Sequence, residues 1–212
     1  MEKAAFVLLG WLLATLSPVI ADAIRKRRRR ADSRKVVLAE LAELKYRLSV
    51  VAYYCEMRYG NPDRPYLEKL RPVLEAYTGP MAVASVKQKV DMLLAMSDQQ
   101  IQAVAEVERG DPSASGLSLK KYPVPFLDMR LKDVEALPDL VQPLLLEIHT
   151  QLGMLDQEAE NAQYYFRLTF DSSLTGDNRD RVEGNLTQAY RQYANVARTI
   201  VKRIGELEAL WK

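Results

Sequence analysis

The chain offers one histidine and one cysteine for acid-base, nucleophilic or metal chemistry, His149 and Cys55. Di-iron bundle proteins take metal ligands from Glu-x-x-His pairs, whereas Glu147 and His149 are two residues apart and point to different faces of a helix. We therefore interpret His149 as a residue at the flank of its helix. Cys55 has no histidine near it in sequence and continues a heptad pattern, which favours a buried structural thiol over a nucleophile.

Acidic residues give no catalytic pattern either. Asp156, Glu158 and Glu160 lie close together in sequence, but an acidic patch on a helix is usually a solvated face. The sequence contains no glycine-rich phosphate loop, HExxH motif, paired CxxC, EF-hand spacing or GxSxG. We therefore expect a protein that is not an enzyme, with no catalytic, cofactor-binding or metal-binding residue and no cofactor.

Tyrosines are the remaining candidates for a binding role. Six fall in segments with helical patterns: Tyr53, Tyr54, Tyr164, Tyr165, Tyr190 and Tyr193. Tyr190 and Tyr193 occupy apolar seam positions, so we expect their rings in the core with the hydroxyls at its edge. The alternative is an aromatic pocket for a ligand between helices.

Charge is distributed very unevenly along the 212 residues, although the formal net charge is only +2. Residues 25–35 carry a net +7, whereas residues 36–212 carry a net −4. The basic residues of the first segment are Arg25, Lys26, Arg27, Arg28, Arg29, Arg30, Arg34 and Lys35. With 48% hydrophobic residues and one cysteine, the composition excludes a wholly disordered chain and a disulfide framework.

An uncharged segment, residues 4–21, directly precedes the basic block. Its eighteen residues are near the lower limit for crossing a hydrocarbon core about 30 Å thick. We predict a transmembrane anchor at 1–24 and a basic juxtamembrane segment at 25–35. Because Lys and Arg close to a span hold that side in the cytoplasm, we expect a single-pass inner-membrane protein with its N-terminus outside and its body in the cytoplasm. A cleaved secretory signal over 1–23 is the alternative, and it would make the body secreted or periplasmic.

The basic block is explained by its position beside the predicted span. It would set the topology and meet anionic lipid headgroups. The region after it is net acidic and shows no stripe of alternating aromatic and basic residues, so we expect no nucleic-acid partner.

The first predicted helix of the body runs to Tyr59, because no Gly or Pro occurs between Pro18 and Gly60. Gly60 is expected to form a left-handed cap. The helix carries a heptad seam: Val37, Leu41, Leu44, Leu48, Val51 and Cys55. This seam is either a dimer interface or a surface covered by other helices of the same chain.

Three further elements are predicted in the middle of the chain. A short helix spans 63–77 with Asp63 as its N-cap, and Pro72 should kink or split it. A third helix covers about 83–109, with Ser97 interrupting its apolar stripe. Turn-forming residues predict the main loop at 110–125, and a short helix at 126–137 follows.

The last 70 residues predict two long helices. The first begins at a capping box of Asp139 and Gln142, and residues 171–178 turn the chain into the second. Its seam is Leu186, Tyr190, Tyr193, Ala197, Ile200, Ile204, Leu207 and Trp211. We expect an all-α protein in which a transmembrane helix precedes an up-down, four-helix-bundle-like body, residues 36–212, with a long C-terminal helical hairpin.

Two functional hypotheses follow from this organisation. The first is a membrane-tethered scaffold or adaptor that acts through protein-protein interaction with an unknown partner or as a homodimer. The second is a sensor bundle that holds a small ligand between helices, with the 110–125 loop as a lid. A cavity of several hundred cubic ångströms with converging polar groups would favour the second.

Overall fold

The computed structural model describes residues 34–80, 84–109, 116–132 and 137–211. The chain divides into two compact units, residues 1–39 and 40–212. Of the first unit only 34–39 are described, and they are helical. The second unit, called the body below, contains helices and no strand among its described residues, which confirms the predicted all-helical bundle.

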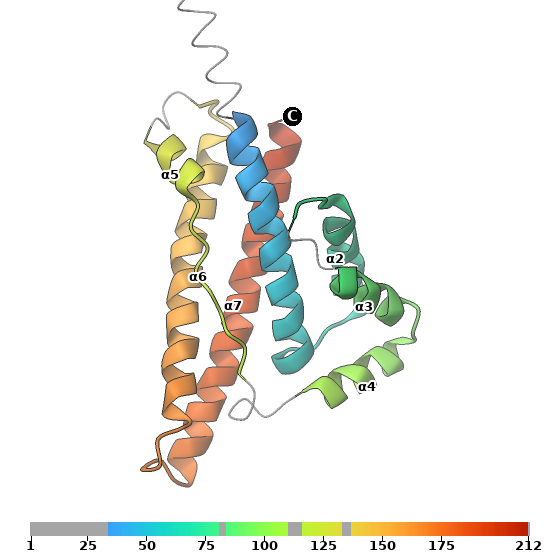
Figure 1. Ribbon diagram of the computed structural model, residues 1–212, viewed down its shortest axis with the longest axis vertical. Helices are drawn as coiled ribbons and strands as arrows, with labels where there is room; N and C mark the ends of the chain where they lie inside the picture. The colour runs from blue at the N-terminus through green and yellow to red at the C-terminus, as the bar shows by residue number, and fades with distance from the viewer. Residues whose placement is uncertain (1–33, 81–83, 110–115, 133–136, 212) are drawn as a thin grey trace, which may run out of the picture. The chain divides into compact units, whose positions relative to one another are not determined.

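Two long helices form the predicted C-terminal hairpin. They are α6 (Gln142–Leu168) and α7 (Asp177–Leu210), and they pack along each other (Figure 1). The predicted seam of α7 is buried along its whole length, from Leu186 to Trp211. Gly176 begins α7 with a φ of 52°, a conformation that side chains other than glycine's rarely adopt. The alternation of apolar residues therefore predicted this hairpin correctly.

A third long helix, residues 34–59, packs antiparallel to α7 and is called the first helix. Lys45 pairs with Glu208 at 2.7 Å, Glu56 pairs with Arg198 at 2.9 Å, and the Tyr59 ring stacks on Tyr190 with centroids 4.4 Å apart. Because the first partner of each pair rises in number as the second falls, the two helices run in opposite directions. The first helix ends at Tyr59, as predicted.

Gly60 ends the first helix for a different reason from the one expected. Among the residues that the structure describes, only Gly176 has a positive φ, so a left-handed cap at Gly60 was wrong. The Gly60 N–H donates to the Glu56 carbonyl at 3.0 Å, and a Cβ at this position would lie 2.1 Å from Glu56 Oε2. The same Cβ would lie 2.9 Å from the Glu56 Cα, and glycine is favoured here because that backbone atom cannot move aside as the carboxylate could.

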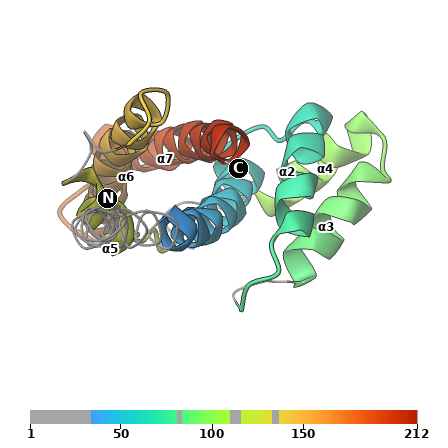
Figure 2. The same cartoon turned by 90° about the horizontal axis from the view of Figure 1, so that it is seen from above.

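Three shorter helices lie against the first helix, on the side away from α6 (Figure 2). They are α2 (Arg64–Ala76), α3 (Ala84–Leu94) and α4 (Asp98–Glu108). Asp63 caps α2 as predicted, since its carboxylate accepts the Tyr66 N–H at 2.8 Å. Their apolar faces form one buried cluster with Tyr46, Tyr53 and Met57 of the first helix.

One prediction for this region was wrong, and a second is contradicted in one of its two alternatives. The helix expected over 83–109 is divided, because the Ser97 hydroxyl and the Gln100 side chain form a capping box that starts α4. Ser97 is therefore a helix start and does not interrupt an apolar face. Pro72 does not split α2, which continues to Ala76.

The bundle also departs from four long helices. Residues 116–124 are extended and lie along α6 and α7, where Leu119 and Val124 are buried. The Tyr190 and Tyr193 hydroxyls donate to the carbonyls of Leu117 and Lys120, and Gln163 Nε2 donates to the Leu119 carbonyl, each at 3.2 Å. An extended segment thus takes the place beside the hairpin where we expected a helix.

The segment continues into α5 (Pro125–Leu131), the short helix predicted over 126–137. The start of α6 was predicted less well. The α6 N-cap is Val141 without a side-chain hydrogen bond, so the capping box of Asp139 and Gln142 was wrong. Gln142 Nε2 instead donates to the Leu137 carbonyl at 2.9 Å.

Candidate functional site

A groove of about 690 Å³ lies between the first helix, α2 and α7 and is open to solvent. Three small residues form its base: Ser49, Ala52 and Gly205. A Cβ on Gly205 would lie 3.7 Å from Lys45 Nζ, so a side chain larger than alanine's at this position would enter the groove.

Apolar and aromatic side chains make up much of the remaining wall, and the helices explain why they are there. Pro65, Tyr66, Leu70 and Val73 come from one face of α2, while Val201 comes from α7. Asp63 fixes the start of α2 and so sets the register of that face. The groove is therefore mainly apolar inside.

Its rim is cationic. Lys45, Lys69, Arg198 and Lys202 line it, against one acid, Asp63. Two of the cations are engaged, because Lys45 pairs with Glu208 and Arg198 pairs with Glu56. The other two are more available to a bound group.

Lys69 and Lys202 differ from the engaged pair in their surroundings. Lys69 is exposed and makes no ion pair with any residue that the structure describes. Lys202 Nζ is 3.9 Å from Glu206, but Arg203 holds that carboxylate at 2.7 Å and its hydrogen bond lowers the Glu206 pKa. The groove thus combines an apolar interior with two exposed ammonium groups.

Tyr66, which lines the groove, contacts Arg198, and Arg198 pairs with the nearly buried carboxylate of Glu56. Arg198 lies over the Tyr66 ring, 5.6 Å from its centroid, while also reaching the nearly buried Glu56 carboxylate. The Tyr66 hydroxyl is buried without a hydrogen-bond partner among the described residues, and burial, with a smaller effect of Glu56, raises its pKa. This hydroxyl remains a neutral donor at physiological pH.

The predicted interaction seam of the first helix is not on the surface. Leu41, Leu44, Leu48 and Cys55 are buried in the body, and Val51 is half-buried. Val37, in the other unit, is also buried. Burial of these side chains within one chain favours the second interpretation of the heptad pattern, a surface covered by the same chain's helices.

The basic block falls mostly outside the described residues, as do the predicted span at 4–21 and Arg25, Lys26, Arg27, Arg28, Arg29 and Arg30. Arg34 and Lys35 lie in the first described turn of the first helix. In the parts of the chain that are described, no helix is both long and apolar enough to cross a membrane.

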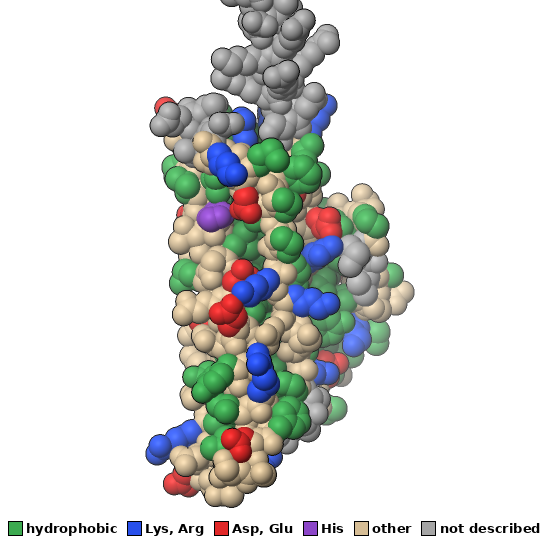
Figure 3. Space-filling model, turned by 60° about the vertical axis from the view of Figure 1, so that its left-hand side comes forward, with side chains coloured by type: hydrophobic (Ala, Val, Ile, Leu, Met, Phe, Trp, Pro, Cys, Tyr) green, Lys and Arg blue, Asp and Glu red, His purple; other side chains and the backbone are tan. Residues whose placement is uncertain are grey.

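The residues considered for chemistry do not converge. His149 is exposed on α6, with Nε2 3.3 Å from Asp128 Oδ1 of α5, and Figure 3 shows it on the surface beside an acidic side chain. Glu160 pairs with Lys121, and burial raises the Asp156 pKa. No group of three potential metal ligands occurs in the described ranges.

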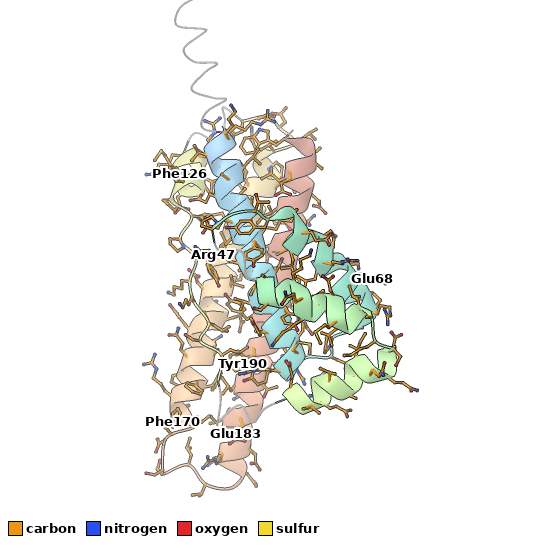
Figure 4. The ribbon with its side chains drawn as sticks, turned by 45° about the vertical axis from the view of Figure 1, so that its right-hand side comes forward. Arg47, Glu68, Phe126, Phe170, Glu183 and Tyr190 are labelled. Carbon is orange, nitrogen blue, oxygen red and sulfur yellow. The ribbon has the colours of Figure 1, made fainter. Side chains whose placement is uncertain are left out.

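Two of the six candidate tyrosines, Tyr190 and Tyr193, bond the backbone of the chain itself. Tyr190 and Tyr193 are buried in the core as expected, and Tyr190 lies inside the bundle (Figure 4). Burial raises both pKa values, and both hydroxyls donate to backbone carbonyls of residues 116–124. Of the expected lid, 110–125, residues 110–115 lie outside the described part of the chain, and residues 116–124 are held by two of the tyrosines that were expected to bind the ligand.

Sequence reasoning missed the groove and therefore Lys69, Arg198 and Lys202. The sequence held two signals for it, an apolar face on α2 and small residues on the first helix and α7. Neither signal shows which helix faces meet, because each pattern lies within one segment. No protein-family model matches the chain, and comparisons with curated proteins and with solved structures found no match.

Proposed function

We propose that this protein is a non-enzymatic, membrane-tethered binding protein whose helical body takes up an acidic segment of a partner protein at the cytoplasmic face. The observation that carries the proposal is the groove between the first helix, α2 and α7, with its apolar interior and cationic rim. The tether rests on the uncharged segment 4–21 and the basic block after it.

The groove suits a helix or strand that carries alternating apolar and acidic residues. Apolar side chains of the partner would fill the space above Ala52 and Gly205, and its carboxylates would pair with Lys69 and Lys202. Opposite charges across an interface mainly select the partner and speed its association.

Photo-crosslinking in native membranes tests the proposal. A benzophenone amino acid at Val73, in the groove, should give one discrete protein adduct, whereas the same group at the exposed Val107 of α4 should not. The pair Lys69→Glu and Lys202→Glu should remove the adduct. The control pair Lys89→Glu and Lys120→Glu changes the net charge by the same amount at exposed positions outside the groove. This pair should leave the adduct intact. Equal adducts from both positions, or none from Val73, would contradict the proposal.

A second candidate is favoured by the size of the groove. Its volume lies within the range of about 300–1,000 Å³ typical of small-ligand sites. The same lining would take an amphiphile with one anionic group and make the body a ligand sensor. Native mass spectrometry separates the two, because a sensor would carry a small bound molecule that Gly205→Met displaces and Gly205→Ala retains.

A further inference from the structure

Four large apolar side chains are exposed around one end of the body. Phe126 and Met129 project from α5 with 47% and 63% of their surface exposed, while Leu127 between them is fully buried. Leu140, just before α6, is 72% exposed, and Leu210, the last residue of α7, is 53% exposed.

These residues lie at the end where the chain enters the body. Glu40, the first residue of the body, accepts the backbone N–H groups of Phe126 and Leu127 at 3.1 and 2.8 Å. Both contacts supply the N-terminal cap that Val124 does not provide for α5. In Figures 1 and 4 the start of α6, the end of α7 and the labelled Phe126 lie at this end, and the labelled Phe170 lies toward the other.

The sequence before residue 40 joins this end of the body to the predicted membrane span. Residues 34–39 are helical, and the twelve residues 22–33 separate them from the uncharged segment 4–21. Even with those twelve fully extended, the connection reaches at most about 50 Å. Since the connection joins the body at Glu40, Phe126 and Met129 lie at the tethered end of the body.

This end of the body carries both acidic and basic residues, and these charges limit how deeply it can enter a bilayer. Asp128 and Asp139 would oppose burial among lipid tails, and Asp128 has His149 beside it. Lys132 and the basic residues 25–35 favour anionic headgroups. This pattern is typical of a shallow contact at the headgroup level, where apolar side chains enter the lipid and charged side chains remain hydrated.

We infer that this apolar end of the body binds the bilayer surface, and that Phe126 and Met129 of α5 insert into the headgroup region. Glu40 positions α5 for this contact through its two hydrogen bonds. The inference rests on the proposed tether. It adds a second point of attachment, which orients the body and its groove relative to the membrane.

The test uses the full chain in vesicles of phosphatidylcholine and phosphatidylglycerol that contain lipid brominated near the headgroup. A fluorescent label on Met129→Cys, in a Cys55→Ala background, should lose about half its emission through contact with the brominated lipid. Labels on Met154→Cys of α6 and Val107→Cys of α4 should lose little, although both positions are exposed. Leu140→Cys gives a second site at the apolar end if the α5 variant does not fold.

Flotation of the same vesicles separates the two proposals. If the chain floats with the vesicles but labels at 129 and 140 are quenched no more than those at 154 and 107, the inference is overturned and the tether stands. If the chain does not float, the tether and the inference both fail. Glu40→Ala should reduce quenching at 129 and leave flotation unchanged, and Glu40→Gln, which keeps one acceptor, should reduce it less.

Discussion

At the scale of single residues, Cys55 is held in an inert state by its surroundings. It is almost fully buried, and burial, with a smaller effect of Glu56, raises the pKa of its thiol from an ordinary value near 9 to about 12. Only the thiolate attacks maleimides or disulfides. A nucleophile or a disulfide-linked dimer through Cys55 is therefore disfavoured in the folded chain.

This predicts that the folded protein resists labelling by a maleimide at pH 8 and reacts fully in denaturant. Mass spectrometry after a short pulse of reagent measures the fraction modified. Above pH 9 the thiol of the unfolded chain loses its proton, while the folded thiol keeps it. The free energy of unfolding should therefore decline as pH rises from about 9 to about 12. Rapid labelling under native conditions would show that the site opens.

Glu56 is the most buried acidic side chain that the structure describes, and Arg198 is its partner. Arg198→Met should leave this carboxylate without a cation and lower the free energy of unfolding by about 2 kcal/mol. The pair Glu56→Gln and Arg198→Met should recover part of that loss, since no buried charge remains. Urea denaturation of the full chain in detergent measures both, and equal stability of the two variants would show that the loss does not come from an unpaired buried carboxylate.

At the scale of helices, α2 continues through Pro72, which the sequence predicted would kink or split it. Pro72 is exposed, so its ring meets solvent, and Glu68, whose carbonyl would otherwise accept the missing N–H, is also exposed. Water can therefore satisfy the unpaired carbonyl. Burial of Leu67, Leu70 and Leu74 on the opposite face holds the helix together across the proline.

Replacing this proline should therefore stabilise the protein. Pro72→Ala restores one helical hydrogen bond and should raise the free energy of unfolding by about 2 kcal/mol, after allowing for the greater freedom of the unfolded chain. Pro65→Ala is the matched control, because proline is favourable in the first turn of a helix and its loss should bring no gain. Thermal unfolding compares the two, and an equal effect would contradict the explanation.

The positions of the helices were largely predictable from the sequence, whereas several helix ends and connections were not. Apolar spacing alone located the first helix, α2, α6 and α7, because each buries one regular stripe. Ser97 was noticed as an interruption of the apolar stripe, but Ser97 and Gln100 were not interpreted as the S-x-x-Q signature of a capping box, so the start of a new helix was missed. The cap on α5 could not be predicted at all, since Glu40 reaches it across more than eighty residues.

At the scale of the whole molecule, the uneven charge makes a prediction about topology. A fluorescent protein fused after Lys212 should be active in the cytoplasm, and an alkaline phosphatase fused there should be inactive, because eight basic residues follow the uncharged segment. Replacing Arg27, Arg28, Arg29 and Arg30 with glutamine should weaken this preference. Phosphatase activity outside the membrane would instead support a cleaved signal at 1–23 and a secreted body.

The sequence by itself determined the helical class, the long C-terminal hairpin, the burial of its seam and the charge asymmetry. These depend on the order of residue types within one segment, and the chain carries that order directly. Only the tertiary structure decided that residues 116–124 replace a helix, that α2 to α4 lie beside the first helix, and that a cationic groove results. Faces of separate helices meet through packing of the whole chain, so Lys69, Arg198 and Lys202 become neighbours only after it folds.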